Sequence, residues 1–324
     1  MSTSTDIKKI LVMKIEAAAG TAETLANADF NIKFASDSIE CDMEIEEYVL
    51  AYASGRHSYG ASTMGKRSVT FKARAPMLLG AAAETPALIT KAFKSCGALE
   101  TVVASTSVAW TPPATKDEGT GVNATIAVQY IFTSGNAVMV TGKGCIGEVS
   151  VTLENGALVA DFEWTGALVS VTDATALVLT SPDTGIVPQL VTGATVTVGG
   201  TAKQFDNFLL KAGNTVELMV DNADTTGYSY AVIRNRNPEL SLNPRMLRLT
   251  NDTAYTRWAA GTQSAISAAT AAVSGLKWTI TAPKGSLKGD GLNAGLRGQE
   301  STWEETYSLR ESTGNDEWKV TQSA

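Results

Sequence analysis

The sequence predicts a mainly β protein, a β-sandwich or barrel with a flanking helix, duplicated in two halves. Thr, Val, Ser, Ala and Gly dominate the composition. Short runs of alternating apolar and polar residues recur about every ten positions with turn residues between them, which is typical of sandwiches and barrels. Similar runs also occur in a similar order in the two halves of the chain.

The strongest strand signal is a hairpin over Gly147–Leu168. Apolar and polar residues alternate on both sides of Asn155-Gly156, a pair that suits the positive φ angles of a tight two-residue turn. One face is therefore apolar and the other polar, as in a half-buried antiparallel hairpin. The residues predicted to face the core are Val149, Val151, Leu153, Leu158, Ala160, Phe162 and Trp164.

Ten shorter runs also have strand character, since each is rich in β-branched or aromatic residues and is bounded by turn residues. In the first half they cover residues 7–14, 30–34, 68–73, 124–132 and 137–141, and in the second half residues 194–198, 216–221, 239–242, 277–282 and 302–310.

Two segments predict helices. The clearer helix covers about residues 85–97, because Thr85-Pro86 suits an N-cap and first helical position and Gly97 suits a helix end. The residues between them place an apolar stripe at helical spacing: Leu88, Ile89, Ala92, Phe93 and Cys96. A weaker helix is predicted over residues 253–260.

The length of 324 residues suggests about two domains. Residues 169–189 are rich in turn and breaker residues, so we place the boundary near Gly185, giving domains 1–185 and 186–324. The run Ser68–Phe71 followed by Pro76 is echoed by Glu239–Leu242 followed by Pro244, which suggests an internal duplication. The first domain has 13 basic and 20 acidic residues, net −7, and the second has 13 of each, net 0.

Composition argues against several classes of protein. The net charge of −7 and the absence of a dense Lys/Arg cluster disfavour a protein that binds nucleic acid through its phosphates. Three scattered cysteines favour neither a disulfide framework nor a zinc site, and fit a reducing cytosol. We expect no signal peptide and no membrane span, because neither pattern is present. A single histidine, His57, leaves few routes to acid–base catalysis.

Four motifs could carry chemistry, and each has a simpler interpretation as surface. The acidic run over residues 40–47 lacks the loop of a calcium site, and strand alternation puts Glu40, Asp42, Glu44 and Glu46 on one face. Gly142-Lys143-Gly144 precedes a hairpin and not a helix, so it does not match a phosphate loop. Asp161 with Glu163, and Glu304 with Glu305, are paired carboxylates of the kind used by glycosidases. We interpret both pairs as solvated surface and expect no enzyme activity and no cofactor.

The remaining polar features suggest contacts between copies of the chain. The polar stretch 44–66 between two strands is predicted to be a long loop, and Arg234 and Arg236 could pair with the acidic strand of another copy. The residues predicted to lie at this interface are Glu44, Glu46, Glu47, Tyr48, Arg56, His57, Tyr59, Arg234 and Arg236.

Several segments carry a resemblance to a known family. The opening strand is followed by Glu16-Ala-Ala-Ala-Gly20, the first helix ends in Ala92-Phe-Lys-Ser-Cys-Gly97, and Gly144-Cys-Ile-Gly147 opens the hairpin that runs to Gly166. In the second half, Ile280-Thr-Ala-Pro283 leads to a closing hairpin that ends at Arg310. In this order and spacing the chain resembles the major tail tube proteins of long-tailed, siphovirus-type phages.

This resemblance implies a structural subunit of the virion tail, assembled in the bacterial cytoplasm. Copies would form rings, and stacked rings would form the conduit for DNA ejection, with residues 44–66 reaching the next ring. A trimeric ring follows if both halves carry the tube sandwich, and a hexameric ring if only the first does. The resemblance also implies a tape-measure protein and tail terminator or tip proteins as partners, with dsDNA passing through unbound.

The acidic bias of the first half suits such a conduit, because an acidic bore would repel phosphates and let a duplex slide. We therefore expect carboxylates of residues 1–185 to line part of it. Two other functions stay open from the sequence: another β module of the virion, such as a capsid decoration or baseplate adaptor protein, and a carbohydrate-binding sandwich or adhesin. The second would cluster aromatic residues on one face, whereas the six tryptophans here are scattered.

Overall fold

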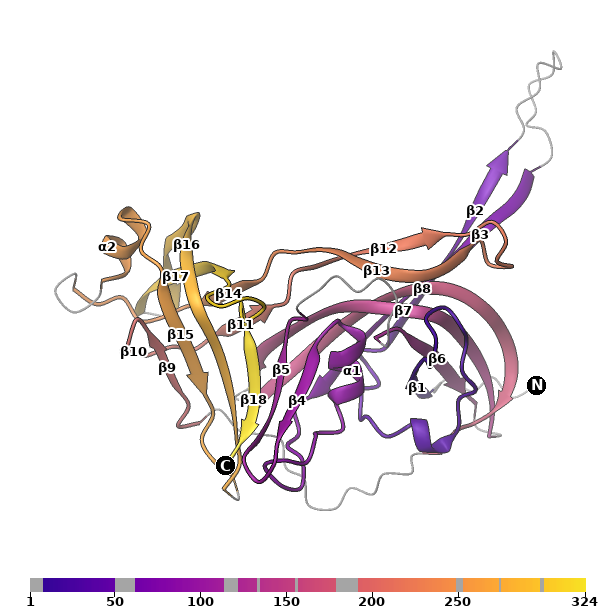
Figure 1. Cartoon of the computed structure of the whole chain (residues 1–324), viewed down its shortest axis with the longest axis horizontal. Coiled ribbons are helices and arrows are strands. Elements are labelled where there is room, and N and C mark those ends of the chain that lie inside the picture. The colour runs from indigo at the N-terminus through magenta and orange to yellow at the C-terminus, as the bar shows by residue number, and fades with distance from the viewer. Residues whose placement is uncertain are drawn as a thin grey trace, which may run out of the picture.

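The computed structural model confirms a mainly β protein (Figure 1). Sixteen of the strands among its described residues join into one sheet, and two more form a separate ribbon. The structure describes residues 8–49, 62–113, 122–132, 135–154, 157–178, 192–248, 253–273, 275–297 and 300–324.

Six strands of the first half pair in the order β1-β6-β7-β8-β3-β2, all antiparallel. They curve around a core that α1 (Thr90–Ser95) covers (Figure 1). The central pair β7–β8 is the predicted hairpin, although each strand has 19 residues and is longer than expected. The strands are β1 (Lys8–Ile15), β2 (Glu40–Val49), β3 (Ser62–Pro76), β6 (Ala124–Ile131), β7 (Asn136–Glu154) and β8 (Ala157–Thr175).

Six strands of the second half pair in the order β9-β15-β16-β17-β14-β11, again all antiparallel. The short β10 (Thr201–Lys203) extends this set beyond β9, and α2 (Ala254–Ala259) precedes β15. The six strands are β9 (Thr195–Val198), β11 (Phe208–Lys211), β14 (Glu239–Leu242), β15 (Ser264–Ala269), β16 (Lys277–Arg297) and β17 (Glu300–Arg310).

Two strand pairs join the halves into one sheet. β11 pairs with β7, and β18 (Lys319–Ser323) pairs with β16 on one side and with β5 (Ser107–Thr111) on the other. β5 in turn pairs with β4 (Leu99–Val103), which has no second partner strand among the described residues. The Trp110 and Trp278 rings, one from each half, lie 5.5 Å apart and are fully buried, so the hydrophobic core is continuous across the junction.

A two-stranded ribbon leaves the second half and crosses the first (Figure 1). It consists of β12 (Asn214–Val220) and β13 (Tyr228–Arg236), and we call it the arm. The arm emerges between β11 and β14 and lies against β7 and β8, with its tip near the base of the β2–β3 hairpin. The sequence predicted a strand at 216–221 but not this excursion.

The inward-facing residues of the β7–β8 hairpin are confirmed. Six of the seven are buried and Leu153 is partly buried against the same core. The Phe162 and Trp164 rings stack at 5.1 Å, and the Trp164 indole nitrogen donates a hydrogen bond of 2.8 Å to Ser95 Oγ in α1. This places the helix on the apolar face of the hairpin, as its apolar stripe predicted.

The helix predicted over 85–97 is shorter in the structure, so its predicted start is wrong. It begins at Thr90, although Gly97 ends it with a positive φ of 77° as expected. The reason is a tertiary contact: Gln322 Nε2 of β18 donates to the Thr85 carbonyl at 2.9 Å and to the Ala82 carbonyl at 2.7 Å. A carbonyl that would begin the helical ladder is thus already paired, and residues 80–85 wrap around Gln322.

Two other predictions need correction. Residues 30–34 do not form a strand. Phe34 is held by edge-on packing against Phe162 and Trp164, and only the short 3₁₀ turn Asn27–Asp29 precedes it. The long loop predicted over 44–66 is also wrong at both ends, because residues 44–49 belong to β2 and residues 62–66 to β3.

The second predicted helix and most of the predicted strands are confirmed, with shifted ends. Seven strands had no counterpart in the sequence prediction: β4, β5, β10, β11, β13, β15 and β18. The boundary near Gly185 and the turn Asn155-Gly156 lie outside the described residues.

Candidate assembly interface

The β2–β3 hairpin projects away from the rest of the molecule (Figure 1). Strand alternation places Glu40, Asp42, Glu44, Glu46 and Tyr48 on one face, as predicted for the four acidic residues. On the other face lie Met43, Ile45 and Glu47, and Glu47 pairs with Met64 of β3. The register shifts between Ile45 and Glu47, so β3 has one extra residue there and the hairpin bends away from the sheet.

The second face of this hairpin is an exposed apolar stripe. Met43, Ile45 and Met64 are 51%, 46% and 65% exposed, and they continue the row whose next members, Val69 and Phe71, are buried in the core. Tyr48 on the acidic face is 64% exposed. A contiguous apolar surface on a projecting strand pair is typical of a contact site for another protein surface.

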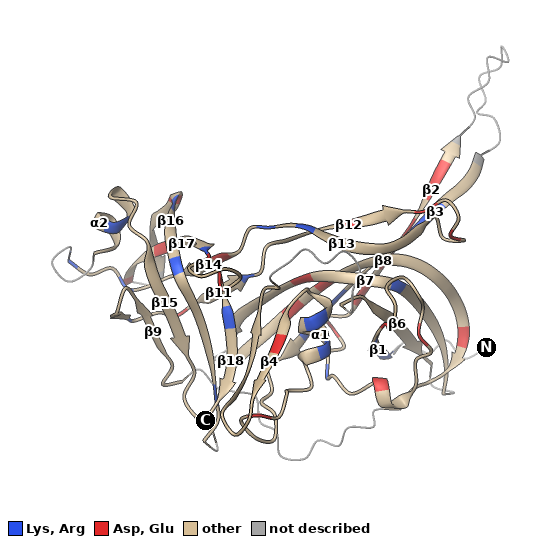
Figure 2. Ribbon diagram, viewed as in Figure 1, with Lys and Arg blue, Asp and Glu red and all other residues tan. Residues whose placement is uncertain are grey.

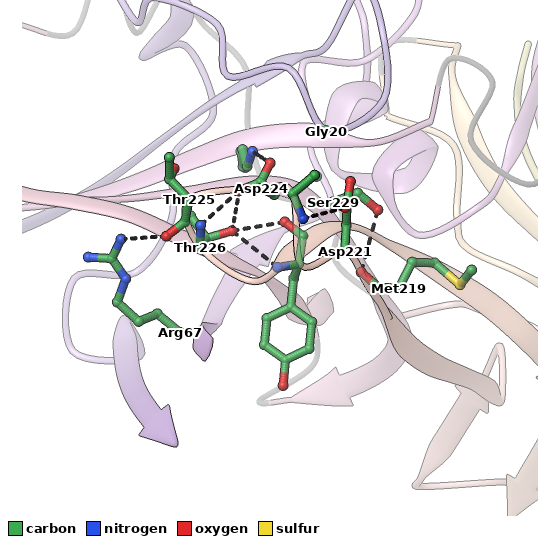
Figure 3. Close-up of polar contacts among 12 residues, drawn as sticks. Gly20, Arg67, Met219, Asp221, Asp224, Thr225, Thr226 and Ser229 are labelled. Atoms are coloured by element: carbon green, nitrogen blue, oxygen red, sulfur yellow. Dashed lines mark hydrogen bonds and ion pairs between the residues drawn. The ribbon is translucent and has the colours of Figure 1, made fainter. Parts of the chain in front are cut away.

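The tip of the arm holds the base of the hairpin (Figure 3). Arg67 of β3 donates its backbone N–H to the Thr226 carbonyl at 2.9 Å and its guanidinium to the Thr225 carbonyl at 3.1 Å. The Tyr228 hydroxyl donates to Glu46 Oε1 at 3.0 Å, and Lys66 lies over the Tyr228 ring. The pairing of β3 with β8 begins at Ser68, so the arm tip accepts the hydrogen bond of β3 directly beyond the point where the pairing with β8 stops.

The turn at the arm tip is ordered by its own acidic residues. Asp224 accepts hydrogen bonds from the Thr226 backbone N–H and hydroxyl, and it forms an ion pair with Lys143 of β7. Burial raises the pKa of Asp224, but these donors outweigh it and lower the pKa to about 2, so the Asp224 carboxylate stays charged at neutral pH. Figure 3 shows how this turn and Asp221 lie relative to Arg67.

The middle of the arm packs closely against the backbone of β7 at Lys143-Gly144, which we call the seat of the arm. Gly144 of β7 has φ +58°, and a Cβ there would lie 2.5 Å from Tyr230 Cα. Asn123 is buried and its amide donates to the Gly144 and Ala231 carbonyls, both at 2.9 Å. At the root of the arm, Asn214 donates similarly to the Cys96 and Gly147 carbonyls at 2.8 and 2.9 Å.

Two carboxylates complete these attachments, the buried Glu16 and the partly buried Glu148. Glu16 accepts hydrogen bonds from the Gly144 and Gly20 N–H groups, both at 2.7 Å, and Glu148 accepts from the Gly213 and Asn214 N–H groups. Burial raises the pKa of Glu16 and of Glu148 above the usual value, and the hydrogen bonds only partly offset this effect. Both groups connect the arm or its seat to the first half.

The two arginines predicted at the interface contact residues of their own chain. Arg234 donates to Glu217 at 2.9 Å across the arm, and Arg236 donates to the Pro113 carbonyl at 3.1 Å and to Glu317 at 3.3 Å. Their predicted contact with the acidic strand of another copy stays a prediction. Arg56, His57 and Tyr59 lie outside the described residues.

Several acidic residues lie on the first-half strands of the sheet (Figure 2). Register places Glu40, Lys72, Glu163 and Glu148 in one row across β2, β3, β8 and β7, and Arg74 binds Asp161 through its Nε at 2.6 Å in the neighbouring row. These residues line an open groove of about 320 Å³. Asp161 and Glu163 thus belong to a cross-strand ladder of ion pairs, with one lysine and one arginine between the acids.

The other chemical motifs occupy structural positions. Lys143-Gly144 forms the seat of the arm. The interpretation of Glu305 as solvated surface is wrong, because its carboxylate is fully buried with Lys203 at 3.4 Å and a hydrogen bond from Tyr307, whereas its neighbour Glu304 is exposed. Across the described ranges, no group of three or more His, Cys, Asp or Glu side chains is arranged to hold a metal ion.

Comparison with known proteins adds no relative. No family model matches the chain. No curated protein matches it either. Among the helices that the structure describes, none is long and apolar enough to cross a membrane.

Sequence reasoning missed the residues that distinguish this region. Met43 and Ile45 were overlooked because the acidic residues of the run 40–47 dominated its interpretation. Met64 was overlooked because it lies in the stretch that was predicted to be a loop. The arm was missed although two signals flank it: Gly213 before β12, and Asn237-Pro238 after β13. Both signals break a strand, and together they mark an excursion from one strand pair.

Proposed function

We propose that this chain is a structural subunit that assembles with copies of itself into rings, and that the rings stack into a tube such as a phage tail tube. The observation that carries the proposal is the β2–β3 hairpin, which projects from the body with an exposed apolar stripe. Burying the stripe against a second copy would remove apolar side chains from water, worth about 25 cal/mol per Å².

The open strand edges support the same function. Among the described residues β2 and β4 each have one partner strand, and Leu99, Val102 and Val103 of β4 are about half exposed. An unpaired edge is a template for another strand, and identical subunits can satisfy it by repeating one contact around a ring. A ring closes the series and prevents uncontrolled growth.

The acidic face of the sheet suits the lining of a conduit for DNA. Its row Glu40, Glu163 and Glu148 has a single lysine, Lys72, among the carboxylates. In our proposal this face borders the bore, where carboxylates repel the duplex and prevent it from adhering. A strongly positive bore in the assembled particle would contradict this part of the proposal.

Electron microscopy of the purified protein tests the proposal. We expect rings or tubes in negative stain, and native mass spectrometry of a single ring should give a mass of three or six chains. Met64→Asp, which puts a charge in the apolar stripe, should abolish assembly without unfolding the chain, whereas the control Met64→Leu should retain it. A chain that stays monomeric at high concentration and binds glycans on an array would refute the tube and favour the carbohydrate-binding alternative.

A further inference from the structure

The two halves of the sheet correspond strand by strand. The orders β1-β6-β7-β8-β3-β2 and β9-β15-β16-β17-β14-β11 match position by position, and the matched strands also follow one another in the same order along the chain. Each half has a short helix between its third and fourth matched strands. In this correspondence β7 matches β16, β2 matches β11, and the arm matches the outer part of the β2–β3 hairpin.

Two local features fix the correspondence to individual residues. β7 contains Lys143-Gly144 and β16 contains Lys288-Gly289, and in each strand the register with its partner shifts there. With these aligned, Leu296 occupies the place of Val151. Ser68 of β3 and Glu239 of β14 are the last residues of these strands that pair with β8 and β17. Their partners Glu44 and Lys211 therefore match, and Met43 occupies the place of Leu210.

Matched residues differ in burial where the halves meet. At the internal junction Leu210 of β11 pairs with Val151 of β7, and they are 3% and 1% exposed. Their counterparts Met43 and Leu296 are 51% and 79% exposed. Strands β2 and β16 thus each present one side of a junction, and the complete junction is the β11–β7 pair inside the chain.

The seat of the arm shows the same difference. Gly144 is covered by Tyr230 of the arm, whereas a Cβ placed on Gly289 would meet no described atom within 4 Å. Past Gly285, β16 pairs only with β17 among the described strands, and Trp258 of α2 donates a hydrogen bond of 2.9 Å to the Lys288 carbonyl. From Gly289 to Arg297 the other edge of β16 has no partner strand among the described residues. The second half therefore has an empty seat and an open edge at the positions where the first half receives the arm.

We propose that the contact between two copies repeats the internal junction. Strand β2 of one copy pairs antiparallel with β16 of the next, with Met43 opposite Leu296 and Glu44 opposite Gly295, and the outer hairpin lies over Gly289 as the arm lies over Gly144. The inference rests on the proposed function and deepens it by naming the surface through which subunits meet.

This contact is heterologous, because one copy offers β2 and the other offers β16. Such a contact propagates from copy to copy until the ring closes. It pairs two open edges and buries Met43 and Leu296 together, with the stabilisation that Leu210 and Val151 already give inside the chain. Opposed residues of antiparallel strands have Cα atoms about 4.5–5.5 Å apart, a separation that a disulfide can span.

Cysteine cross-linking tests the register. In a background with Cys41→Ser, mixing Met43→Cys chains with Leu296→Cys chains under mild oxidation should give a covalent dimer, while neither variant alone should. The double variant should give a ladder of oligomers that ends at the ring. A matched control, Met43→Cys mixed with Gly295→Cys, is one residue out of register and should give at least tenfold less dimer.

The outcomes separate this inference from the function on which it rests. Rings that form without the cross-link, or cross-linking among Met43→Cys chains alone, would overturn the inference but would not contradict the proposed tube function. A chain that forms no assembly overturns both. Gly289→Trp, which fills the empty seat, should abolish rings with the unfolding midpoint unchanged. Normal ring formation by this variant would show that the hairpin does not lie there.

Discussion

Replacing Gly144 by alanine should loosen the arm from the first half. Gly144 has φ +58°, where an alanine costs about 1–2 kcal/mol. Its Cβ would also lie 2.5 Å from Tyr230 Cα, so the arm must move away by about 1 Å to restore an ordinary van der Waals distance. That shift weakens the hydrogen bonds of Asn123 to the Gly144 and Ala231 carbonyls, worth about 1 kcal/mol each.

We therefore expect Gly144→Ala to lower the free energy of unfolding by about 2–4 kcal/mol. Urea denaturation followed by tryptophan fluorescence measures this, at a concentration where light scattering shows a monomer. Hydrogen exchange of β12 and β13 should rise more than exchange of β8, because the arm is displaced and the hairpin beneath it is not.

The chain supplies a matched control in Gly289→Ala. Gly289 follows a lysine in the corresponding strand, has no positive φ and has open space around it, so the same substitution should cost less than about 0.5 kcal/mol in the monomer. Equal losses for the two variants would refute the reasoning, since the difference depends on the positive φ of Gly144 and on the arm that covers it. Unchanged exchange of the arm in Gly144→Ala would refute it as well.

Three further predictions concern buried polar groups. Ser95→Ala removes the acceptor of the buried Trp164 indole N–H and should cost about 1–3 kcal/mol in urea unfolding, whereas Ser95→Thr should cost less. Gln322→Ala removes the partner of Gly80 N–H and the Ala82 and Thr85 carbonyls, so amides 80–85 should lose protection in hydrogen exchange while α1 keeps it. Because the pKa of Glu16 is raised in the folded state, the folded chain binds this proton more tightly than the unfolded chain does. The free energy of unfolding should therefore rise as the pH falls from 7 towards the ordinary glutamate pKa, and it should rise less steeply in Glu16→Gln. An identical pH slope for the two proteins would contradict this.

Sequence periodicity predicted the parts of the fold that are half buried and regular. From Gly147 to Trp164 the β7–β8 hairpin keeps a regular register, with one face towards the core and the other towards water, so the alternating pattern names its buried residues correctly. The exact start of α1 was not accessible, because the side chain that competes for the Thr85 carbonyl is Gln322, 237 residues away. A local pattern carries no signal of such a partner.

The candidate interface was only partly predictable for a related reason. The face of Glu40, Asp42, Glu44 and Glu46 follows from alternation alone. The apolar stripe of Met43, Ile45 and Met64 depends on a one-residue bulge in β3, which moves Met64 to the face of Ile45. The intrachain partners of Arg234 and Arg236 depend on how the arm lies, and the sequence did not show that β12 and β13 leave the sheet.

Carrying two halves in one chain has a consequence for assembly. In the proposed ring every second junction is already made inside a chain, so fewer bodies must lose their translational and rotational freedom, at about 4–15 kcal/mol for each association. The internal junction also fixes the angle between neighbouring halves before any copies meet. If the contact between copies repeats that angle and six such steps close a circle, three chains form the ring that six separate domains would otherwise have to build. Because the internal junction sets this angle, weakening the seat at Gly144 should change the ring and give open or irregular assemblies. An error in that junction would be repeated three times around the circle.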